Sequence, residues 1–455
     1  MTGLTCFKAY DIRGRLGVDL DEEIAYRIGR AFAQALGART VVLGCDVRAS
    51  SKALSARVAQ ALVDEGCHVL DLGLSGTEEM YFATTHFCAD GGICVTASHN
   101  PMDYNGMKMV RASSAPLDAA TELDRIRQLA EQDAFGAPSS GGRVSDVSTR
   151  SRAAYVERVV SFVDVNALRP LKILVNAGHG AAGPTFDAIA AHLATLDAPL
   201  SFERLFFEPD GTFPQGVPNP LLPENRPVTA NAVVAMQADF GVAWDGDFDR
   251  CFFFDHTGTF IDGEYVVGLL AEAFLVRNPG ATIVHDPRII WNTQDIVARA
   301  GGRAVQTRTG HAFVKQAMRD ENAIYGGEMS AHHYFRDFVY CDSGMIPWLL
   351  VAELVSRNGP LADLVASRKA AFPSSGEINF TLKDPQAALA RVRMAFEAEA
   401  RAIDETDGLG IDLGLWRFNL RSSNTEPVVR LNVEARGEAE KVAAGVERVR
   451  AVLLS

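Results

Sequence analysis

The sequence contains no apolar run that approaches the about 18 residues of a membrane-spanning helix, and its first residues, MTGL, lack the basic and apolar segments of a signal peptide. Its seven cysteines are scattered and form no CxxC pair, so we expect neither a disulfide framework nor a zinc site. Basic residues are outnumbered, with 44 Lys and Arg against 57 Asp and Glu, and they form no long basic stripe, which argues against a nucleic-acid or membrane partner. We therefore expect a soluble, cytoplasmic protein with reduced thiols.

The chain has 455 residues, of which 47% are hydrophobic and 22% charged, a composition typical of globular proteins. At roughly 150 residues per domain, this length indicates about three domains, and two to four are reasonable. One pattern occurs three times: an apolar strand, a helix, a second strand, and a third strand that ends in a polar loop. The three copies open at residues 40–44, 172–176 and 281–285. Strands that alternate with helices predict α/β domains with mixed or parallel sheets.

The pattern changes near residue 367 to a strand, a helix, two strands and a final helix, which predicts a smaller α+β domain at the C-terminal end. The stretch GAPSSGGRVSD, residues 136–146, is the most linker-like part of the chain and marks the first boundary. The predicted fold is therefore three similar mixed-sheet α/β domains followed by a small α+β domain. The predicted limits are 1–150, 151–254, 255–367 and 368–455.

The most informative loop follows the apolar segment GGICV, residues 91–95, and reads TASHNP. Such a run continues neither a strand nor a helix, so Ser98 is expected on a loop at a strand end. A Ser98–His99 pair there indicates a nucleophilic or phosphate-carrying hydroxyl, because a hydroxyl needs assistance from a base, a metal or a positive field. An Asn-Pro turn with a capping serine is the structural alternative.

A second loop carries Asp245, Asp247 and Asp249 in alternation. Two carboxylates about 4 Å apart repel by roughly 4 kcal/mol at an effective dielectric near 20, so three converging carboxylates need a cation. Ligands that are all oxygen indicate a hard ion, most simply Mg²⁺. An EF-hand is excluded because Arg250 and His256 stand where that loop needs glycine and glutamate. A solvated acidic turn remains the alternative.

Two cations near these loops are candidates for the same chemistry. Arg250, next to the aspartates, is placed to take a phosphoryl oxygen. Lys108 follows Ser98 by ten residues and is a candidate general acid or base if the site lowers its pKa. A plain surface lysine is the alternative for Lys108.

Two later loops have the composition of binding sites. The residues Glu328, Ser330 and His332 are suited to neighbouring sugar hydroxyls, with a purely structural loop as the alternative. A donor-rich turn with Arg421, Ser423, Asn424 and Thr425 suits a phosphate monoester, with an ordinary hairpin turn as the alternative.

Five motifs resemble, in order and content, those of the α-D-phosphohexomutase superfamily. They are YDIRG at 10–14, TASHNP at 96–101, DGDFDR at 245–250, GEMSAH at 327–332 and RSSNT at 421–425. The GEMSAH form resembles the bacterial phosphomannomutase/phosphoglucomutase branch, whereas glucosamine mutases tend to carry glutamine at the position of Met329. Arg288, in DPRI, stands where relatives often place a lysine.

The resemblance implies a role for each motif. Ser98 would be the phosphoserine of the first domain, and the three aspartates of the second domain would bind Mg²⁺ together with Ser98. The sugar-binding third domain and the phosphate-binding fourth domain would complete a central cleft. The residues implied to line the phosphoryl-transfer site are Tyr10, Arg13, His99, Lys108 and Arg250. Those implied to bind substrate are Arg288, His311, Glu328, Ser330, His332, Arg421, Ser423, Asn424, Thr425 and Arg430.

The implied reaction moves a phosphoryl group between the 1- and 6-positions of mannose and glucose phosphates, with a hexose 1,6-bisphosphate as intermediate and activator. The implied partner is the hexose phosphate, and the implied state is a monomer. The alternatives are phosphoglucosamine mutase, a Mg-dependent sugar phosphatase that uses water as acceptor, and a sugar-phosphate sensor without turnover.

Overall fold

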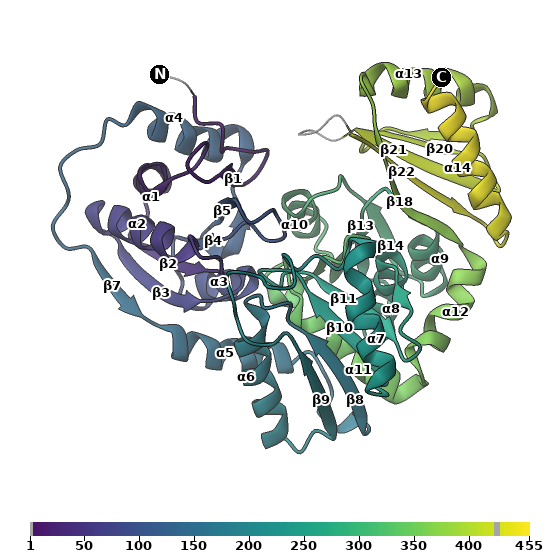
Figure 1. Cartoon of the computed structure of the whole chain (residues 1–455), viewed down its shortest axis with the longest axis horizontal. Coiled ribbons are helices and arrows are strands. Elements are labelled where there is room, and N and C mark those ends of the chain that lie inside the picture. The colour runs from purple at the N-terminus through teal and green to yellow at the C-terminus, as the bar shows by residue number, and fades with distance from the viewer. Residues whose placement is uncertain (1–2, 423–427) are drawn as a thin grey trace. The chain divides into compact units, whose positions relative to one another are not determined.

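The structure, a computed structural model, describes residues 3–422 and 428–455 (Figure 1). The chain forms two compact units: Met1–Phe260 with Asp337–Arg357, and Ile261–Arg336 with Asn358–Ser455. In the part of the chain that is described, no helix has the length and apolarity that crossing a bilayer requires.

The first unit begins with a mixed sheet and four helices. They are β1 (Ile12–Arg15), α1 (Glu22–Leu36), β2 (Thr40–Cys45), α2 (Ser51–Asp64), β3 (His68–Leu74), α3 (Thr77–His86), β4 (Gly91–Val95), β5 (Tyr104–Arg111), β6 (Ala115–Pro116), α4 (Asp124–Gln132) and β7 (Arg143–Asp146). The strand order is β1-β5-β4-β2-β3-β7, and β2, β3, β4 and β7 are parallel. The side chain of Asp21 caps the start of α1, and Gly37 ends this helix with φ of 60°.

The second sheet of this unit has the order β12-β11-β10-β8-β9, in which β8, β9 and β10 are parallel. Its elements are α5 (Ser148–Val160), β8 (Leu171–Asn176), α6 (Ala182–Thr195), β9 (Leu200–Leu205), α7 (Arg226–Ala235), β10 (Phe240–Trp244), β11 (Cys251–Asp255) and β12 (Phe260–Ile261). The later segment with β17 (Cys341–Asp342) and α11 (Met345–Asn358) follows in the chain, and the part around α11 packs here. The ring of Trp348 lies 5.2 Å from that of Phe186, and Trp244 Nε1 donates to Gly344 O at 2.9 Å.

The second unit begins with a third mixed sheet. Its elements are α8 (Gly263–Arg277), β13 (Thr282–His285), α9 (Trp291–Arg299), β14 (Arg303–Gln306), α10 (His311–Asp320), β15 (Tyr325–Gly327) and β16 (His333–Phe335), and α12 (Leu361–Ala371) follows later in the chain. Strand β13 pairs in parallel with β14 and β15, and β16 returns antiparallel to β15.

The three mixed sheets share one topology. The order of return strand, third strand, first strand and second strand is β5-β4-β2-β3, then β11-β10-β8-β9, then β16-β15-β13-β14. In each sheet the loop between the third strand and the return strand carries the unusual residues, which are Ser98, the aspartates and Glu328 with its neighbours. The predicted threefold pattern and fold class are confirmed.

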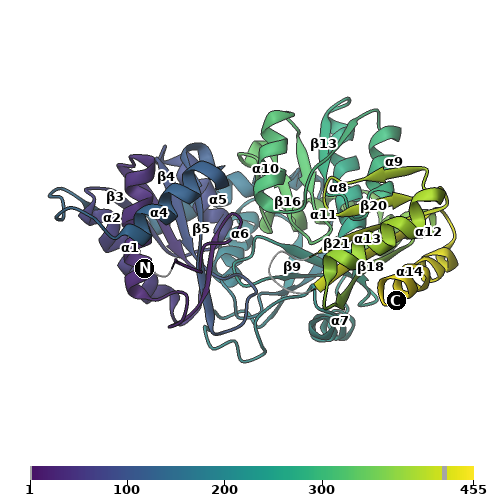
Figure 2. The same ribbon diagram turned by 90° about the horizontal axis from the view of Figure 1, so that it is seen from above.

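The last sheet is antiparallel, with the order β18-β22-β21-β20-β19. Its elements are β18 (Ser374–Thr381), α13 (Pro385–Phe396), β19 (Ala402–Asp404), β20 (Leu409–Asp412), β21 (Trp416–Ser422), β22 (Val428–Ala435) and α14 (Ala439–Leu453). Helices α13 and α14 cover one face of this sheet (Figure 2) and form with it one apolar core, to which Phe396, Phe418 and Val449 contribute.

The linker-like stretch differs from the prediction at its end. Residues 143–146 form β7, which pairs in parallel with β3 from Arg143 opposite His68. This edge strand is mostly exposed and has Val144 as its only apolar residue, so it carries no alternating pattern. Strands β19 and β20 and helices α11 and α12 also lie outside the elements that the sequence predicted.

A buried ion pair fixes the start of α9 in the second unit. Arg417 and Glu434 are opposite each other on β21 and β22, and Arg417 Nη1 lies 2.7 Å from Glu434 Oε1, with side chains 3% and 0% exposed. Glu434 also accepts from the backbone N–H groups of Ile290, at 2.8 Å, and Trp291, at 3.0 Å. The loop that carries Arg288 is thereby attached to the fourth sheet, since Arg417 Nη1 donates to Arg288 O at 3.0 Å.

We expect Glu434→Ala to destabilise the protein by about 3 kcal/mol or more, because it leaves the Arg417 charge buried without its partner. Differential scanning calorimetry should show a lower midpoint for the transition of the second unit. Glu438→Ala, at an exposed position next to α14, is the control and should leave the midpoint unchanged. Equal midpoints for the Glu434 and Glu438 variants would contradict the role of the pair.

Candidate active site

Ser98 lies in the loop between β4 and β5, at a strained position. It is 1% exposed and has φ of 50°, in the left-handed region that side chains rarely adopt. Its backbone N–H donates to Thr96 Oγ1 at 2.8 Å, and Thr96 Oγ1 in turn donates to Asp46 Oδ2 at 2.7 Å. The surrounding hydrogen bonds therefore hold the strained backbone in place.

Arg48, which the sequence analysis did not select, binds the outside of this loop. Its Nη2 donates to Ser98 O at 2.8 Å and to Asn100 O at 2.5 Å, and its Nη1 donates to Pro101 O at 2.9 Å and Tyr104 O at 3.1 Å. One buried guanidinium thus satisfies four carbonyl groups of the Ser98 loop. The sequence feature that could have indicated Arg48 is the charged sequence Asp46-Val47-Arg48, which directly follows the apolar strand β2.

The loop after β10 brings its three aspartates together and onto Ser98. Asp245, Asp247 and Asp249 are 0 to 1% exposed, and one carboxylate oxygen of each lies within 4.8 Å of the others. Ser98 Oγ donates to Asp245 Oδ2 at 2.8 Å, although the two residues are 147 positions apart. The predicted serine and aspartate motifs are therefore neighbours within the first unit.

Two basic side chains compensate these carboxylates. Lys108 Nζ lies 2.8 Å from Asp247 Oδ2 and also pairs with Asp249, and Arg250 Nε lies 3.1 Å from Asp245 Oδ2. Burial favours the neutral amine of Lys108, but Asp247 and Asp249 outweigh it and raise the pKa of Lys108. In this arrangement the pKa of Lys108 is raised and not lowered, and the acid–base role of Lys108 stays a prediction.

The donor set fits a hard divalent cation. Three buried carboxylates face two cations, and Asp247 Oδ1 is buried without a hydrogen bond from any described residue. Oxygen ligands without Cys or His suit Mg²⁺. Thr77, the first residue of α3, donates from Oγ1 to Asp247 Oδ2 at 2.5 Å and so orients that carboxylate. Thr77 was not predicted, because its contact with Asp247 spans 170 positions of the chain.

The remaining predicted residues of the transfer site lie around Ser98. His99 Nδ1 is 3.0 Å from Ser98 Oγ and contacts Arg250, and burial followed by the charge of Arg250 lowers the pKa of His99 well below its usual value. Arg13 Nη1 donates to Asn100 Oδ1 at 2.5 Å. Tyr10 is partly buried three residues before Arg13 and interacts with it electrostatically.

In the second unit, the loop after β15 places Glu328 and Ser330 beside Arg288. Arg288 Nη2 donates to Ser330 Oγ at 3.2 Å and lies 3.7 Å from Glu328 Oε1. Glu328 accepts from Gly310 N at 2.9 Å and from the hydroxyl of Tyr334 at 2.5 Å. These bonds hold the Glu328 carboxylate at a defined position, where its remaining lone pairs can accept further hydrogen bonds.

Two histidines flank this loop. His311 is the first residue of α10, directly after Gly310, whose N–H contacts Glu328. The ring of His332 stacks on that of Tyr334, with centroids 6.0 Å apart.

The fourth-sheet residues lie on β21 and β22, where Arg421 and Arg430 face each other in the strand register. Arg421 Nη1 also lies 3.4 Å from Asp407 Oδ2. The predicted residues Ser423, Asn424 and Thr425 lie outside the described residues.

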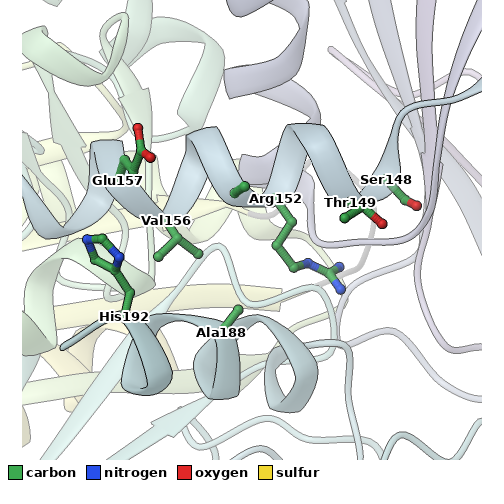
Figure 3. Close-up of a pocket in the computed structure, with 8 residues that line it drawn as sticks. Ser148, Thr149, Arg152, Val156, Glu157, Ala188 and His192 are labelled. Carbon is green, nitrogen blue, oxygen red and sulfur yellow. The ribbon is translucent and has the colours of Figure 1, made fainter. Parts of the chain in front are cut away.

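A separate cavity of about 430 Å³ lies between α5 and α6 (Figure 3). Its lining includes Arg152, Glu157 and His192, and none of the predicted site residues. Arg152 has a structural partner, since its Nε lies 2.9 Å from Glu79 Oε1. The site chemistry is therefore found at the loops and not at this cavity.

Models of one protein family match all four parts of the chain. The family models for phosphoglucomutase/phosphomannomutase match in chain order: alpha/beta/alpha domain I over residues 5–137, domain II over 153–258, domain III over 262–372, and the C-terminal domain over 377–452.

The similar proteins include curated enzymes and a solved structure. A phosphomannomutase of Salmonella typhimurium (strain LT2) is 59% identical over 454 residues, with 100% of both chains covered. A phosphomannomutase of Escherichia coli (strain K12) is 58% identical over 441 residues, with 96% of both chains covered. A phosphoglucomutase/phosphomannomutase family protein from Burkholderia thailandensis is 33% identical with a TM-score of 0.86, covering 99% of this chain and 98% of that one. Because the four family models and the curated relatives together cover the whole chain, this chain belongs to the phosphoglucomutase/phosphomannomutase family. It is a phosphohexomutase, an isomerase that acts on hexose phosphates.

Proposed function

We propose that the enzyme interconverts the 1- and 6-phosphates of mannose and glucose through a phosphoserine at Ser98. In the first half-reaction, the bond from Ser98 Oγ to phosphorus breaks as a hydroxyl of the hexose phosphate bonds to that phosphorus, which gives the 1,6-bisphosphate. The bisphosphate then reorients and returns its other phosphoryl group to Ser98. The free bisphosphate would therefore also activate enzyme that has lost its phosphate.

The observation that carries this proposal is the contact of Ser98 Oγ with Asp245, at 2.8 Å, inside a cluster of three buried carboxylates. A serine used only as a turn cap has no need of such a cluster. The strained backbone of Ser98 and the four carbonyls held by Arg48 support the same assignment, because a group that carries a phosphoryl must be fixed in position.

The charge balance supports a resident divalent ion, which we assign as Mg²⁺. Phosphorylation of Ser98 would add nearly two negative charges to three carboxylates whose charged ion-pair partners, among the described residues, are Lys108 and Arg250. Asp245, Asp247, Asp249 and the Ser98 phosphate would hold the ion, which when bound supplies positive charge to the phosphoryl oxygens. Lys108 and Arg250 would hold the transferred group and stabilise its charge.

Sugar recognition is assigned to the second unit. Glu328 and Ser330 present acceptors near Arg288, with His311 and His332 at the flanks, and Arg421 with Arg430 would bind the phosphate that does not react. The names of the relatives at 58 and 59% identity favour mannose, and Met329 argues against glucosamine as the sugar.

The proposed reaction predicts the outcome of ³¹P NMR with the enzyme, Mg²⁺ and catalytic glucose 1,6-bisphosphate. Mannose 1-phosphate and glucose 1-phosphate, in separate tubes, should each give a growing 6-phosphate signal. Growth from one sugar alone would restrict the specificity, release of inorganic phosphate would identify a phosphatase, and turnover of glucosamine 1-phosphate alone would identify the alternative mutase.

Ser98→Ala should reduce kcat by at least about a thousandfold, since it removes the group that carries the phosphoryl. Binding of mannose 1-phosphate, measured by calorimetry, should be retained. Ser113→Ala is the matched control, because Ser113 is an exposed serine with a positive φ of 60° in the same sheet region. Normal turnover in Ser98→Ala would remove Ser98 from its proposed role.

Thr77→Val should weaken Mg²⁺ binding by about tenfold, the effect expected when a hydrogen bond that orients a metal ligand is lost. The measurement is the Mg²⁺ concentration that gives half of the thermal stabilisation of the metal-free enzyme. Thr77→Ser keeps the hydroxyl and should restore the wild-type value. Identical Mg²⁺ dependence in the Val and Ser variants would show that Thr77 does not orient the ligand.

A further inference from the structure

Two arginines lie directly opposite each other on the fourth sheet. Arg421 on β21 and Arg430 on β22 are register partners in an antiparallel pair, with side chains 16% and 35% exposed. Like charges at directly opposite positions destabilise a sheet. This pair therefore needs an anion close by.

Glu377 supplies that anion from the neighbouring strand. Its Oε2 lies 3.6 Å from Arg421 Nη2 and 3.7 Å from Arg288 Nη1, and its Oε1 lies 3.7 Å from Arg430 Nη1. One carboxylate, 18% exposed, thus lies among three guanidinium groups. Glu377 is placed there by the irregularity that shifts the register of β18 between Ser374 and Glu377, where Gly376 has φ of 63°.

Arg288 has a closer partner of its own, since its Nη2 lies 2.6 Å from Asp286 Oδ2, whereas the contacts of Glu377 with Arg421 and Arg430 neutralise these two arginines without saturating them. All three distances from Glu377 exceed the range of a hydrogen bond, and Glu377 Oε2 is buried without a hydrogen bond from any described residue. Burial and then the charge of Arg288 lower the pKa of Arg421, despite the nearby Asp407 and Glu377. The positive charge at Arg421 is therefore only partly compensated, and its donors remain available to a stronger anion.

We propose that Glu377 is a positioning residue that acts as an internal counter-anion of Arg421 and Arg430 and is exchanged for the phosphate of the substrate. This inference rests on the proposed assignment of Arg421 and Arg430 to phosphate binding. A carboxylate with one charge holds the guanidinium groups near their binding positions, whereas a phosphate, with nearly two charges and more acceptor oxygens, displaces it.

The exchange affects both binding and release of the phosphate. A fixed counter-anion weakens phosphate binding because it competes for the same donors. It also speeds departure of the phosphate, since the arginines regain a partner as the ligand leaves. Both effects suit the bisphosphate intermediate, which must leave the phosphate site and bind again in the reverse orientation.

The test is Glu377→Gln, which keeps the shape of the side chain and removes its charge. Calorimetric titration with inorganic phosphate in the presence of EDTA should show binding about fivefold tighter than in the wild type, the effect of losing one partly screened ion pair. The KM for mannose 1-phosphate should fall, and kcat should fall with it, because release becomes slower. Glu399→Gln, an exposed position that pairs with Arg448 in the same domain, is the control and should behave as the wild type.

Phosphate binding that is unchanged or weaker in Glu377→Gln would overturn the proposal, since a purely structural role predicts one of those results. If that variant fails to fold, Glu377→Asp gives the second measurement: retraction of the carboxylate by one methylene should tighten binding by about twofold, and weaker binding overturns the proposal. Arg421→Ala tests the underlying assignment separately. If it leaves phosphate affinity unchanged, the phosphate site itself is misassigned, whatever Glu377 does.

Discussion

Three carboxylates converge at the end of β10, and the residues around them stabilise this concentration of negative charge. Two charges at such a distance repel by several kcal/mol even at a protein-like dielectric, so the triad is stable only with Lys108, Arg250 and hydroxyl donors around it. Those partners come from β5, from the N-terminal residue of α3 and from the Ser98 loop. The three aspartates therefore connect the first two sheets of the first unit. Ser98 lies next to Asp245, where the negative charge of the three carboxylates converges.

The shared topology explains why unrelated residues can occupy equivalent places. In each mixed sheet the chain leaves a buried third strand, turns sharply and returns antiparallel, and each turn includes a residue other than glycine with positive φ: Ser98, Phe248 and Ala331. Such positions are strained and persist only where neighbouring contacts fix them. One backbone arrangement thus presents Ser98, the three aspartates and the loop of Glu328 at the same position of three sheets.

The sequence predicted those parts of the structure that periodicity and local motifs determine. Apolar runs located most of the parallel strands, and the two later strands predicted in the C-terminal domain correspond to β21 and β22. Strand β22 alternates between apolar and polar residues along its central part. The edge strand β7 was missed because it buries little apolar surface. Arg48, Thr77 and Glu377 were missed for a different reason: each acts through contacts with residues far away in the sequence. The pKa of Lys108 was open for the same reason, because only the fold places its amine between Asp247 and Asp249.

In the second unit, too, carboxylates compensate buried or partly buried positive charges, and two such groups differ in their effect. Arg417 and Glu434 are buried, close and saturated by backbone partners, so they fix the loop that carries Arg288. Arg421 and Arg430, on the same two strands, are held at longer range by Glu377 and remain partly unsatisfied. Two arginine–glutamate groupings on one sheet thus differ in distance and saturation. A saturated pair gives rigidity, whereas an unsaturated one retains binding capacity, because a donor already in a short hydrogen bond has little to gain from a ligand. The longer distances from Glu377 to Arg421 and Arg430 therefore leave the donors of these two arginines available to a ligand.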